Sequence, residues 1–450
     1  MPTPEQSADF RNLGGHIPTA TSEQPTNVRR LVFLMACGIS FLLYLHRYTW
    51  GFIKKDVIEE FGWTAETVSW LDSLFPLAYG LTQIPSGMIC DWFGSHILLG
   101  VSILLWSLSL GGIAFARDLA AVAFARVTFG VTQAACYPAL NKISKNWFPI
   151  QTRTAAQGLI ATFFGRAGGA ISFILFGPVL MHMLGMSWRT SMCVLSAIGV
   201  VCGIAFLLLF RNTPREHPWA NAAEAELISA GDITAAQATG SRLNWGAMAR
   251  NVSMWFLLFR AIASNMADIL YVYWLPLYLR DVKQLDTSAA GWLAALPLLG
   301  GAFGGIASGF LQTLILARTG NRRWARSSIG LIGKLVAAAL MLASLSLSNP
   351  VLIACTFLVV KFFSDWEQPA EWGAASDLAG RNAATVFACV NTLGSIGGAL
   401  AGPITARVLK NWGWDAVFIL IAGEYLLAGL AWLFIDCTKP IEPAIEATNE

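Results

Sequence analysis

The stretch Ala416–Ile435, AVFILIAGEYLLAGLAWLFI, decides the class of structure. A helix needs about 20 apolar residues to cross the hydrocarbon core of a bilayer, and this stretch carries one charged residue, Glu424. A second stretch, Thr190–Phe210, carries none. Segments of this length predict membrane-spanning helices, because a helix satisfies its own backbone hydrogen bonds in lipid.

The composition extends this prediction to the whole chain. Of the 450 residues, 55% are hydrophobic and 13% are charged, and one soluble core cannot bury so much apolar surface. A soluble enzyme, a disordered chain and a disulfide scaffold are therefore excluded. The net charge of +3 is too small to indicate nucleic-acid binding. The eight Cys residues show no metal-ligand spacing, so we expect no metal and no cofactor.

Apolar runs of spanning length recur along the chain. We predict an all-α integral membrane protein with twelve transmembrane helices, at about 30–53, 67–90, 96–116, 119–142, 153–181, 189–210, 251–279, 288–316, 326–347, 351–375, 382–409 and 415–435.

The polar segments between these runs predict the domain organisation. We expect a disordered tail at 1–28, six helices within 29–210, a central loop at 211–250, six helices within 251–436 and a tail at 437–450. With the tails placed inside, 16 Lys and Arg residues lie on the inner side and 8 on the outer side, where Lys54 and Lys55 are counted. This bias predicts a multi-pass protein of the plasma (inner) membrane with both termini cytoplasmic.

The two sets of six helices resemble each other in sequence. Arg153-Thr-Ala-Ala is followed by Gly165, Gly168-Gly169 and Gly177-Pro178, and 228 residues later Arg381-Asn-Ala-Ala is followed by Gly394, Gly397-Gly398 and Gly402-Pro403. Such small residues allow close helix packing. Chance similarity of glycine-rich helices is the alternative, but the ordered match favours duplication. Two parallel halves of six helices describe the major facilitator fold.

Charged residues lie inside the predicted helices, where each costs about 2.5–3.5 kcal/mol on insertion scales. The embedded basic residues are Arg47, Arg126, Arg166, Arg260, Lys334 and Lys361, and the embedded acids are Asp72, Asp268, Asp365, Glu367, Glu371 and Glu424. So many charges predict a water-filled path between the helices. For Arg166, Arg260 and Glu424 we favour interhelical ion pairs.

Arg47 and Arg126 are the best candidates for a substrate site. Counted from the outer helix ends, both lie roughly 9–11 Å deep, and two guanidinium groups at one depth suit a carboxylate. Tyr44 shares a face with Arg47, Gln133 lies two turns beyond Arg126, and Tyr79 lies two turns below Asp72. The alternative is that each arginine pairs with an acid such as Asp72.

The tenth predicted helix carries the polar residues of the second half. Lys361 and Asp365 are four residues apart and suit an ion pair, whereas the like charges of Glu367 and Glu371 favour protonation of one of them. A protonated carboxylate there is a candidate proton carrier, and a structural network with Lys334 and Lys361 is the equal alternative. The other polar candidates for the cavity or for ion coupling are Asn265, Asp268, Asn391 and His46.

At this point the motifs resemble a known family, the anion:cation symporters of the major facilitator superfamily, which carry sugar acids and other organic anions. The similarity covers roughly residues 30–436. The motifs that carry it are Arg211-Asn-Thr-Pro with Glu216-His217-Pro218 and Glu224, Trp274-Leu-Pro-Leu-Tyr-Leu279, Trp147-Phe148-Pro149, Asn391 before a glycine-rich stretch, and the superfamily loop residues Gly87, Asp91 and Gly94.

The resemblance implies roles for particular residues. Arg47 and Arg126 fall where this family holds the substrate carboxylate, and Tyr44, Tyr79, Trp372 and Asn391 fall near its sugar-facing positions. The family couples transport to protons through an acid at the place that Gln133 occupies here. Because Gln133 cannot titrate, the resemblance leaves another carboxylate (Glu367, Glu371 or Asp268), a uniporter or sodium coupling as alternatives.

The sequence as a whole therefore predicts a transporter that imports a small organic anion, such as a hexuronate or hexonate, by alternating access with proton symport. An exporter or antiporter of a carboxylated metabolite or drug is the main alternative. The chain has no P-loop, GxGxxG or HExxH motif, so we expect no enzyme activity. We expect the lipid bilayer, the carboxylate substrate and a proton or sodium ion as partners of a monomer.

Overall fold

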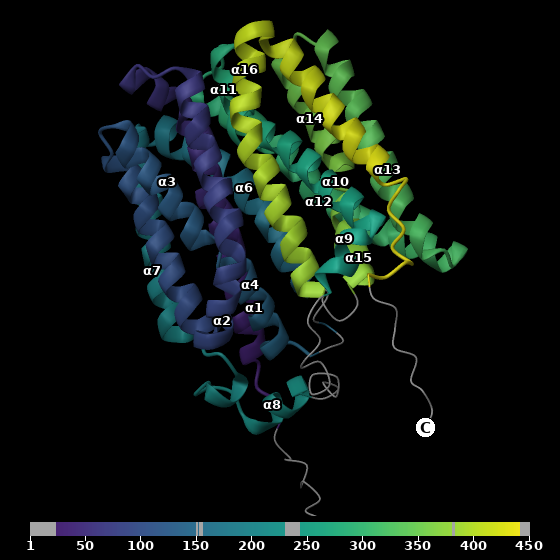
Figure 1. The fold of residues 1–450 in the computed structure, drawn as a ribbon. Coiled ribbons are helices and arrows are strands. Elements are labelled where there is room, and N and C mark those ends of the chain that lie inside the picture. The colour runs from purple at the N-terminus through teal and green to yellow at the C-terminus, as the bar shows by residue number, and fades with distance from the viewer. Residues whose placement is uncertain (1–23, 150–151, 153–155, 230–243, 380–382, 442–450) are drawn as a thin grey trace, which may run out of the picture.

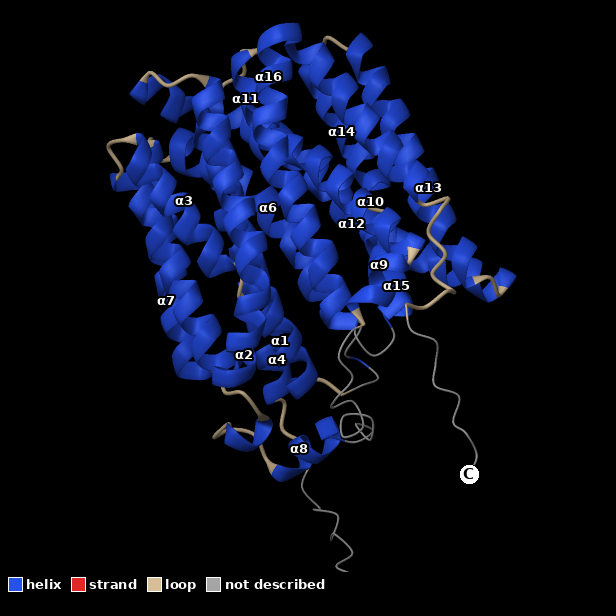
Figure 2. Cartoon of the chain, in the orientation of Figure 1, coloured by secondary structure: helices blue, strands red, loops and turns tan. Residues whose placement is uncertain are grey.

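A computed structural model describes residues 24–149, 152, 156–229, 244–379 and 383–441. The side chains of Asp91 and of residues 383–385 lie outside this description. All regular structure in the described ranges is helical (Figures 1 and 2). The helices are α1 (Val28–Phe61), α2 (Ala65–Phe115), α3 (Leu119–Gln133), α4 (Cys136–Trp147), α6 (Gly165–Ile174), α7 (Trp188–Leu209), α8 (Ala222–Ser229), α9 (Trp245–Arg250), α10 (Val252–Ile269), α11 (Leu275–Asp281), α12 (Thr287–Thr319), α13 (Arg322–Ala343), α14 (Pro350–Ser364), α15 (Glu367–Ala379) and α16 (Ala383–Ala431).

The described helices make twelve passages. Nine helical stretches among the described residues are long and apolar enough to cross a membrane. One of them, Val386–Ala431, contains two passages, because the backbone turns at Gly413 (φ 79°). The part of α2 before its own turn at Gly94 and the α14–α15 pair supply two more. The predicted all-α fold with twelve transmembrane helices is confirmed.

Short polar side chains fix where many of these passages begin. The side chains of Thr64, Asp118, Ser187, Asp286 and Asn349 each accept a hydrogen bond from a backbone N–H of the first turn of α2, α3, α7, α12 and α14. Such caps satisfy donors that a helix start otherwise leaves without partners. α1 instead continues to Phe61, so the predicted end of the first helix at residue 53 is wrong, and Lys54 and Lys55 lie within the helix.

The two halves repeat the same close helix contacts. A Cβ atom on Gly168 would lie 2.2 Å from the carbonyl oxygen of Phe41, and one on Gly397 would lie 2.5 Å from that of Ile262. These glycines come from the two sequence blocks, and each brings its helix against the first helix of its own half. The backbone contacts support the predicted duplication.

Breaks and turns in the backbone repeat as well. α3 gives way to α4 at Ala134-Ala135, and α14 gives way to α15 at Asp365-Trp366. Pro138 and Pro369 follow these breaks at the same distance, and each removes a helical N–H donor. The residues with positive φ also fall at matching loops of the two halves: Gly62 with Gln284, Gly94 with Gly320, and Gly185 with Gly413.

The two halves meet mainly toward one end of the molecule. We call the end that carries α8 and the start of α1 the proximal end, and the opposite end the distal end (Figure 1). Arg280 bonds Asp56 at 2.6 Å across the halves at the distal end, and Ser73 bonds the carbonyl of Ala399 at 2.5 Å further in. Among described residues, the hydrogen bond between the halves that lies nearest the proximal end joins Thr392 to the carbonyl of Gly80. The halves are therefore closed against each other distally.

Candidate functional site

Arg47 and Arg126 both lie close to one aromatic ring, that of Phe75. The guanidinium carbon of Arg47, from α1, is 4.9 Å from the centroid of the Phe75 ring, and that of Arg126, from α3, is 5.3 Å from it. The predicted end of the first helix at residue 53 is wrong, since α1 extends to Phe61 and Arg47 lies farther from the helix end than we counted. Both guanidinium groups nevertheless lie near the same residue of α2, Phe75.

Neither guanidinium forms an ion pair with a carboxylate in the described part of the chain. Asp72, the acid that we considered as a partner, is bound by Lys54 Nζ at 2.7 Å and by Trp50 Nε1 at 2.7 Å. Arg126 instead donates from Nε to the carbonyl of Leu71 at 3.3 Å, and it is 1% exposed. The two arginines are thus embedded cations whose charge no described acid balances.

Neutral and aromatic groups surround Arg47. Gln133 Oε1 accepts a hydrogen bond from Arg47 Nε at 3.1 Å, and Gln133 donates to the carbonyl of Leu43. The rings of Tyr44 and Tyr79 lie 5.0 Å and 4.8 Å from the Arg47 guanidinium carbon. Arg47 Nη2 is buried and has no hydrogen-bond partner among the described residues. The structure thus brings together Tyr44, Tyr79 and Gln133, the three neighbours predicted for this site.

Sequence reasoning missed two aromatic neighbours of Arg126. Tyr273, in the π-helical turn Leu270–Trp274 of the second half, meets Arg126 Nη2 through its hydroxyl at 3.2 Å. Trp50 of α1 lies 4.8 Å from the Arg126 guanidinium carbon. The available signal was Tyr273's position beside the conspicuous motif that begins at Trp274. Tyr273 makes this a site to which both halves contribute.

A second cluster joins the halves next to this site. Arg166, from α6 in the first half, lies 2.9 Å from Asp365 and 3.5 Å from Asp268. Lys361 lies 2.6 Å from Asp268 and 2.5 Å from Asp365. The predicted Lys361–Asp365 pair and the predicted pairing of Arg166 across helices are both present. We call these four residues the bridging cluster.

A third cluster lies wholly within the second half. Arg260 of α10 binds Glu367 at 2.9 Å and Glu371 at 2.6 Å, and Lys334 binds Glu367 at 2.8 Å. Ser264 and Trp432 also donate to Glu367. The predicted pairing of Arg260 is present, and Lys334 joins the network as the structural alternative expected. Lys361 does not join it, because its carboxylate partners are Asp268 and Asp365.

The remaining candidates lie apart from the two arginines. Trp372 is 42% exposed and packs on Phe387 at 4.5 Å between ring centroids. Asn391 is half-buried, and its carbonyl accepts from Ser395. His46 is 1% exposed, and its ring packs against Gly199 of α7 within the first half. The ion pair expected for Glu424 is wrong: this buried acid has no partner among the described residues, and its Oε2 makes no hydrogen bond there.

The loop motif lies at the proximal end. Gly94 has φ 79°, and a Cβ atom there would meet the side chain of Asn212 at 2.8 Å, so both the turn and the packing require glycine. Asn212 accepts a hydrogen bond from the N–H of His96 at 2.9 Å. Gly87 faces Pro138 of α4, and the side chain of Asp91 lies outside the description.

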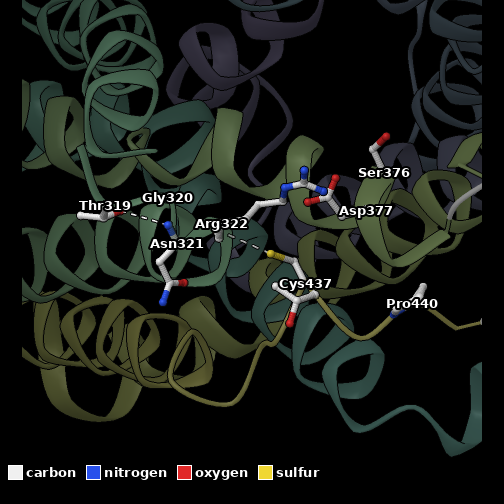
Figure 3. Close-up of a pocket in the computed structure, with 9 residues that line it drawn as sticks. Thr319, Gly320, Asn321, Arg322, Ser376, Asp377, Cys437 and Pro440 are labelled. Carbon is white, nitrogen blue, oxygen red and sulfur yellow. Dashed lines mark hydrogen bonds between the residues drawn. The ribbon is translucent and has the colours of Figure 1, made fainter. Parts of the chain in front are cut away.

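An open pocket of about 920 Å³ lies elsewhere, at the proximal surface of the second half (Figure 3). Residues of the α12–α13 turn and of the segment after α16 line it, and Arg322 and Asp377 project there. Its walls include none of the predicted site residues. The exposed position makes it a surface feature distinct from the arginine site.

Curated proteins similar to this chain are anion transporters by name. A probable sulfoacetate transporter of Cupriavidus necator is 27% identical, over 95% of this chain and 98% of that protein. A probable L-galactonate transporter of Escherichia coli (strain K12) is 27% identical, over 96% of this chain and 94% of that protein. A probable galactarate/D-glucarate transporter of Bacillus subtilis is 25% identical, over 91% and 92%.

Solved structures share the fold. A bacterial homologue of the human lysosomal transporter Spinster matches with a TM-score of 0.67 at 17% identity, over 91% of this chain and 95% of that chain. A nucleoside transporter matches with a TM-score of 0.68 at 14% identity, over 90% and 99%.

The family model of the Major Facilitator Superfamily matches residues 36–402. Its members and the relatives above are transporters and not enzymes, as the sequence predicted. The relatives also confirm the predicted resemblance to the superfamily's organic-anion carriers. The chain is a multi-pass integral membrane protein that belongs to the Major Facilitator Superfamily.

Proposed function

We propose that this protein imports a small organic anion, of the sugar-acid type, by alternating access. The substrate carboxylate binds between Arg47 and Arg126, and rocking of the two halves exposes the site to each side of the membrane in turn. The relatives named for sulfoacetate, galactonate and galactarate/glucarate support an anionic substrate.

One observation carries this proposal: Arg47 and Arg126 are embedded, adjacent to one ring and without a carboxylate partner in the described structure. An embedded charge without a partner is costly, so a protein that keeps two of them side by side keeps them for a ligand of opposite charge. A charge-assisted hydrogen bond contributes about 1.5–3 kcal/mol, so an anion held by both groups gains about 3–6 kcal/mol from them.

Counterflow in proteoliposomes tests the proposal. Vesicles preloaded with a hexonate, a hexuronate or sulfoacetate should accumulate the labelled form of the transported anion, and Arg126→Ala should reduce this exchange more than about 100-fold. Arg189→Ala is the matched control, because Arg189 is an arginine at the distal surface that pairs with Glu60 at 2.7 Å. Undiminished exchange by Arg126→Ala would contradict the anion site.

In this proposal the proximal end faces the cytoplasm, so both termini lie on the cytoplasmic side of the plasma (inner) membrane. The excess of Lys and Arg in the proximal loops supports that orientation. Protease treatment of right-side-out vesicles should leave a tag on the C-terminal tail intact. Cleavage of the tag in sealed vesicles would show the opposite orientation, and the proposed direction of transport would then be wrong.

We assign the coupling proton to Glu371. Its cation partner is Arg260 at 2.6 Å, whereas Glu367 is bound by Arg260, Lys334, Ser264 and Trp432. Glu371→Gln should keep counterflow but lose accumulation driven by a pH gradient, and Glu367→Gln is the neighbouring control. Accumulation that survives a protonophore and follows a sodium gradient would overturn proton symport.

A further inference from the structure

The two halves carry opposite charges at one duplicated position. Gly165 packs on the ring of Tyr44 in the first half, and Gly394 packs on the side chain of Asn265 in the second. Arg47 lies three residues after Tyr44, and Asp268 lies three residues after Asn265. The repeat thus places a cation on α1 where it places a carboxylate on α10.

Asp268 is the most accessible member of the bridging cluster. Its side chain is 24% exposed, against 13% for Arg166, 2% for Asp365 and 1% for Lys361. Because Asp268 pairs with Arg166 of the other half, it lies at the junction of the two halves. The exposed part of its carboxylate therefore lies beside the contact between the two halves.

The bridging cluster is electrically balanced. It contains the two cations Arg166 and Lys361 and the two carboxylates Asp268 and Asp365, and each cation contacts both carboxylates. It therefore offers no net positive charge to a second acidic group. The unbalanced positive charge of the site lies at Arg47 and Arg126, around Phe75.

The cluster lies close to the arginine site along the first half. Arg166 follows Gly165, whose backbone touches the Tyr44 ring, and the same ring lies 5.0 Å from the Arg47 guanidinium carbon. A chain-like acid whose carboxylate binds between Arg47 and Arg126 would meet Asp268 where it extends along these contacts. The groups that it meets at Asp268 must be hydrogen-bond donors, because an ionised carboxylate only accepts.

We propose that Asp268 accepts hydrogen bonds from the hydroxyl groups of the substrate. The site then selects a singly charged, hydroxylated carboxylate over an extended dicarboxylate. This inference rests on the proposed function and specifies its substrate class. A second carboxylate at the far end of the substrate would lie against Asp268 and add a like charge that the balanced cluster does not neutralise.

Binding of three acids of equal length to purified protein tests this inference. A hexonate carries one carboxylate and hydroxyls, hexanoate carries one carboxylate alone, and a hexarate carries hydroxyls and two carboxylates. Wild-type protein should bind the hexonate at least tenfold more tightly than either of the others. Equal affinity for hexonate and hexarate would overturn the charge argument.

The variant Asp268→Asn assigns the effect to this residue. It should weaken hexonate binding about tenfold and leave hexanoate binding unchanged, so that hexanoate also reports folded protein. Asp365→Asn is the matched control, because it removes an equally paired carboxylate of the same cluster that is 2% exposed; it should change both affinities alike. If Asp268→Asn weakens the binding of hexonate and of hexanoate equally, Asp268 does not bind the substrate hydroxyls. That result would leave the proposed anion site at Arg47 and Arg126 unaffected. If wild-type protein binds none of the three acids, the proposed function fails and this inference fails with it.

Discussion

The two halves of this transporter treat their embedded cations differently. In the second half, Arg260, Lys334 and Lys361 each lie within 3 Å of a carboxylate. In the first half, Arg166 and Lys54 are also paired with carboxylates. Arg47 and Arg126 instead have aromatic rings, a glutamine and a backbone carbonyl as neighbours. The duplicated fold therefore pairs these three embedded cations of the second half, and leaves two cations of the first half without a described carboxylate partner.

The difference depends on one further pair. Lys54 binds Asp72 at 2.7 Å, and Asp72 follows Leu71, whose carbonyl accepts from Arg126. Asp72 is thus the acid that lies nearest along the chain to the Arg126 contact, and Lys54 engages it. The comparison teaches that an embedded cation stays without an ion-pair partner only when the neighbouring acids are bound by other cations.

The largest effect should follow from breaking a paired cation. Arg260→Ala leaves Glu371 without its cation and Glu367 with Lys334 alone, and losing one partner of a buried pair costs about 3–5 kcal/mol. We expect the melting temperature in detergent to fall by about 5 °C or more. Arg126→Ala, which breaks no ion pair, is the matched variant and should melt near the wild type. Equal destabilisation by both variants would contradict the distinction between the halves.

Removing the Lys54 partner of Asp72 should weaken anion binding at Arg126. In Lys54→Met the carboxylate of Asp72 becomes available to Arg126, and competition with the substrate should weaken uptake about tenfold. The double variant with Lys54→Met and Asp72→Asn removes both charges and should recover to within about threefold of wild type. A double variant as inactive as the single one would mean that Lys54 acts in another way.

A smaller, pH-dependent effect is expected when an acid is placed beside Arg47. In Gln133→Glu the new carboxylate takes the position of the amide that now accepts from Arg47. Ionised, it neutralises Arg47 and should lower substrate affinity several-fold at pH 7.5; protonated, it should restore affinity as the pH falls toward 5. Affinities measured at both pH values check this, and a ratio equal to that of wild type would argue against direct contact of Arg47 with the anion.

The smallest effect should come from an ion pair at the distal surface. Lys410 and Glu66 join the halves at 2.9 Å, but their side chains are 68% and 58% exposed. Exposed pairs contribute little because water and salt screen them, so Lys410→Ala should change uptake less than about twofold. A large loss would show that closure at the distal end depends on this contact.

Much of the fold was predictable because hydrophobic length is a local property. The runs around Thr190–Phe210 and Ala416–Ile435 and the glycine blocks at Gly168 and Gly397 need no tertiary information to be recognised. Helix ends were less predictable, and α1 shows why. Lys54 is charged, and we placed the end of the helix before it, but a partner on α2 makes its burial possible.

The candidate site was predictable in its cations but only partly in their pairing: the Lys361–Asp365 pair follows from helical spacing, whereas pairs between distant helices do not. Arg47, Arg126, Tyr44, Tyr79 and Gln133 were recognised from helical spacing and resemblance. Which acid meets which base depends on helix rotation and on neighbours far apart in sequence, as with Arg166 and Asp365. The approach of Tyr273 to Arg126 is a contact between halves, and no spacing within one helix indicates it.

Equilibrium binding of a hexonate, hexuronate or sulfoacetate to purified protein tests the central claim most directly. By isothermal titration calorimetry we expect one site per chain in the wild type and in Arg189→Ala, and at least about 30-fold weaker binding in Arg47→Ala and in Arg126→Ala, with both variants still folded. If these two variants bind the anion as tightly as the wild type does, the unpaired arginines are not its site.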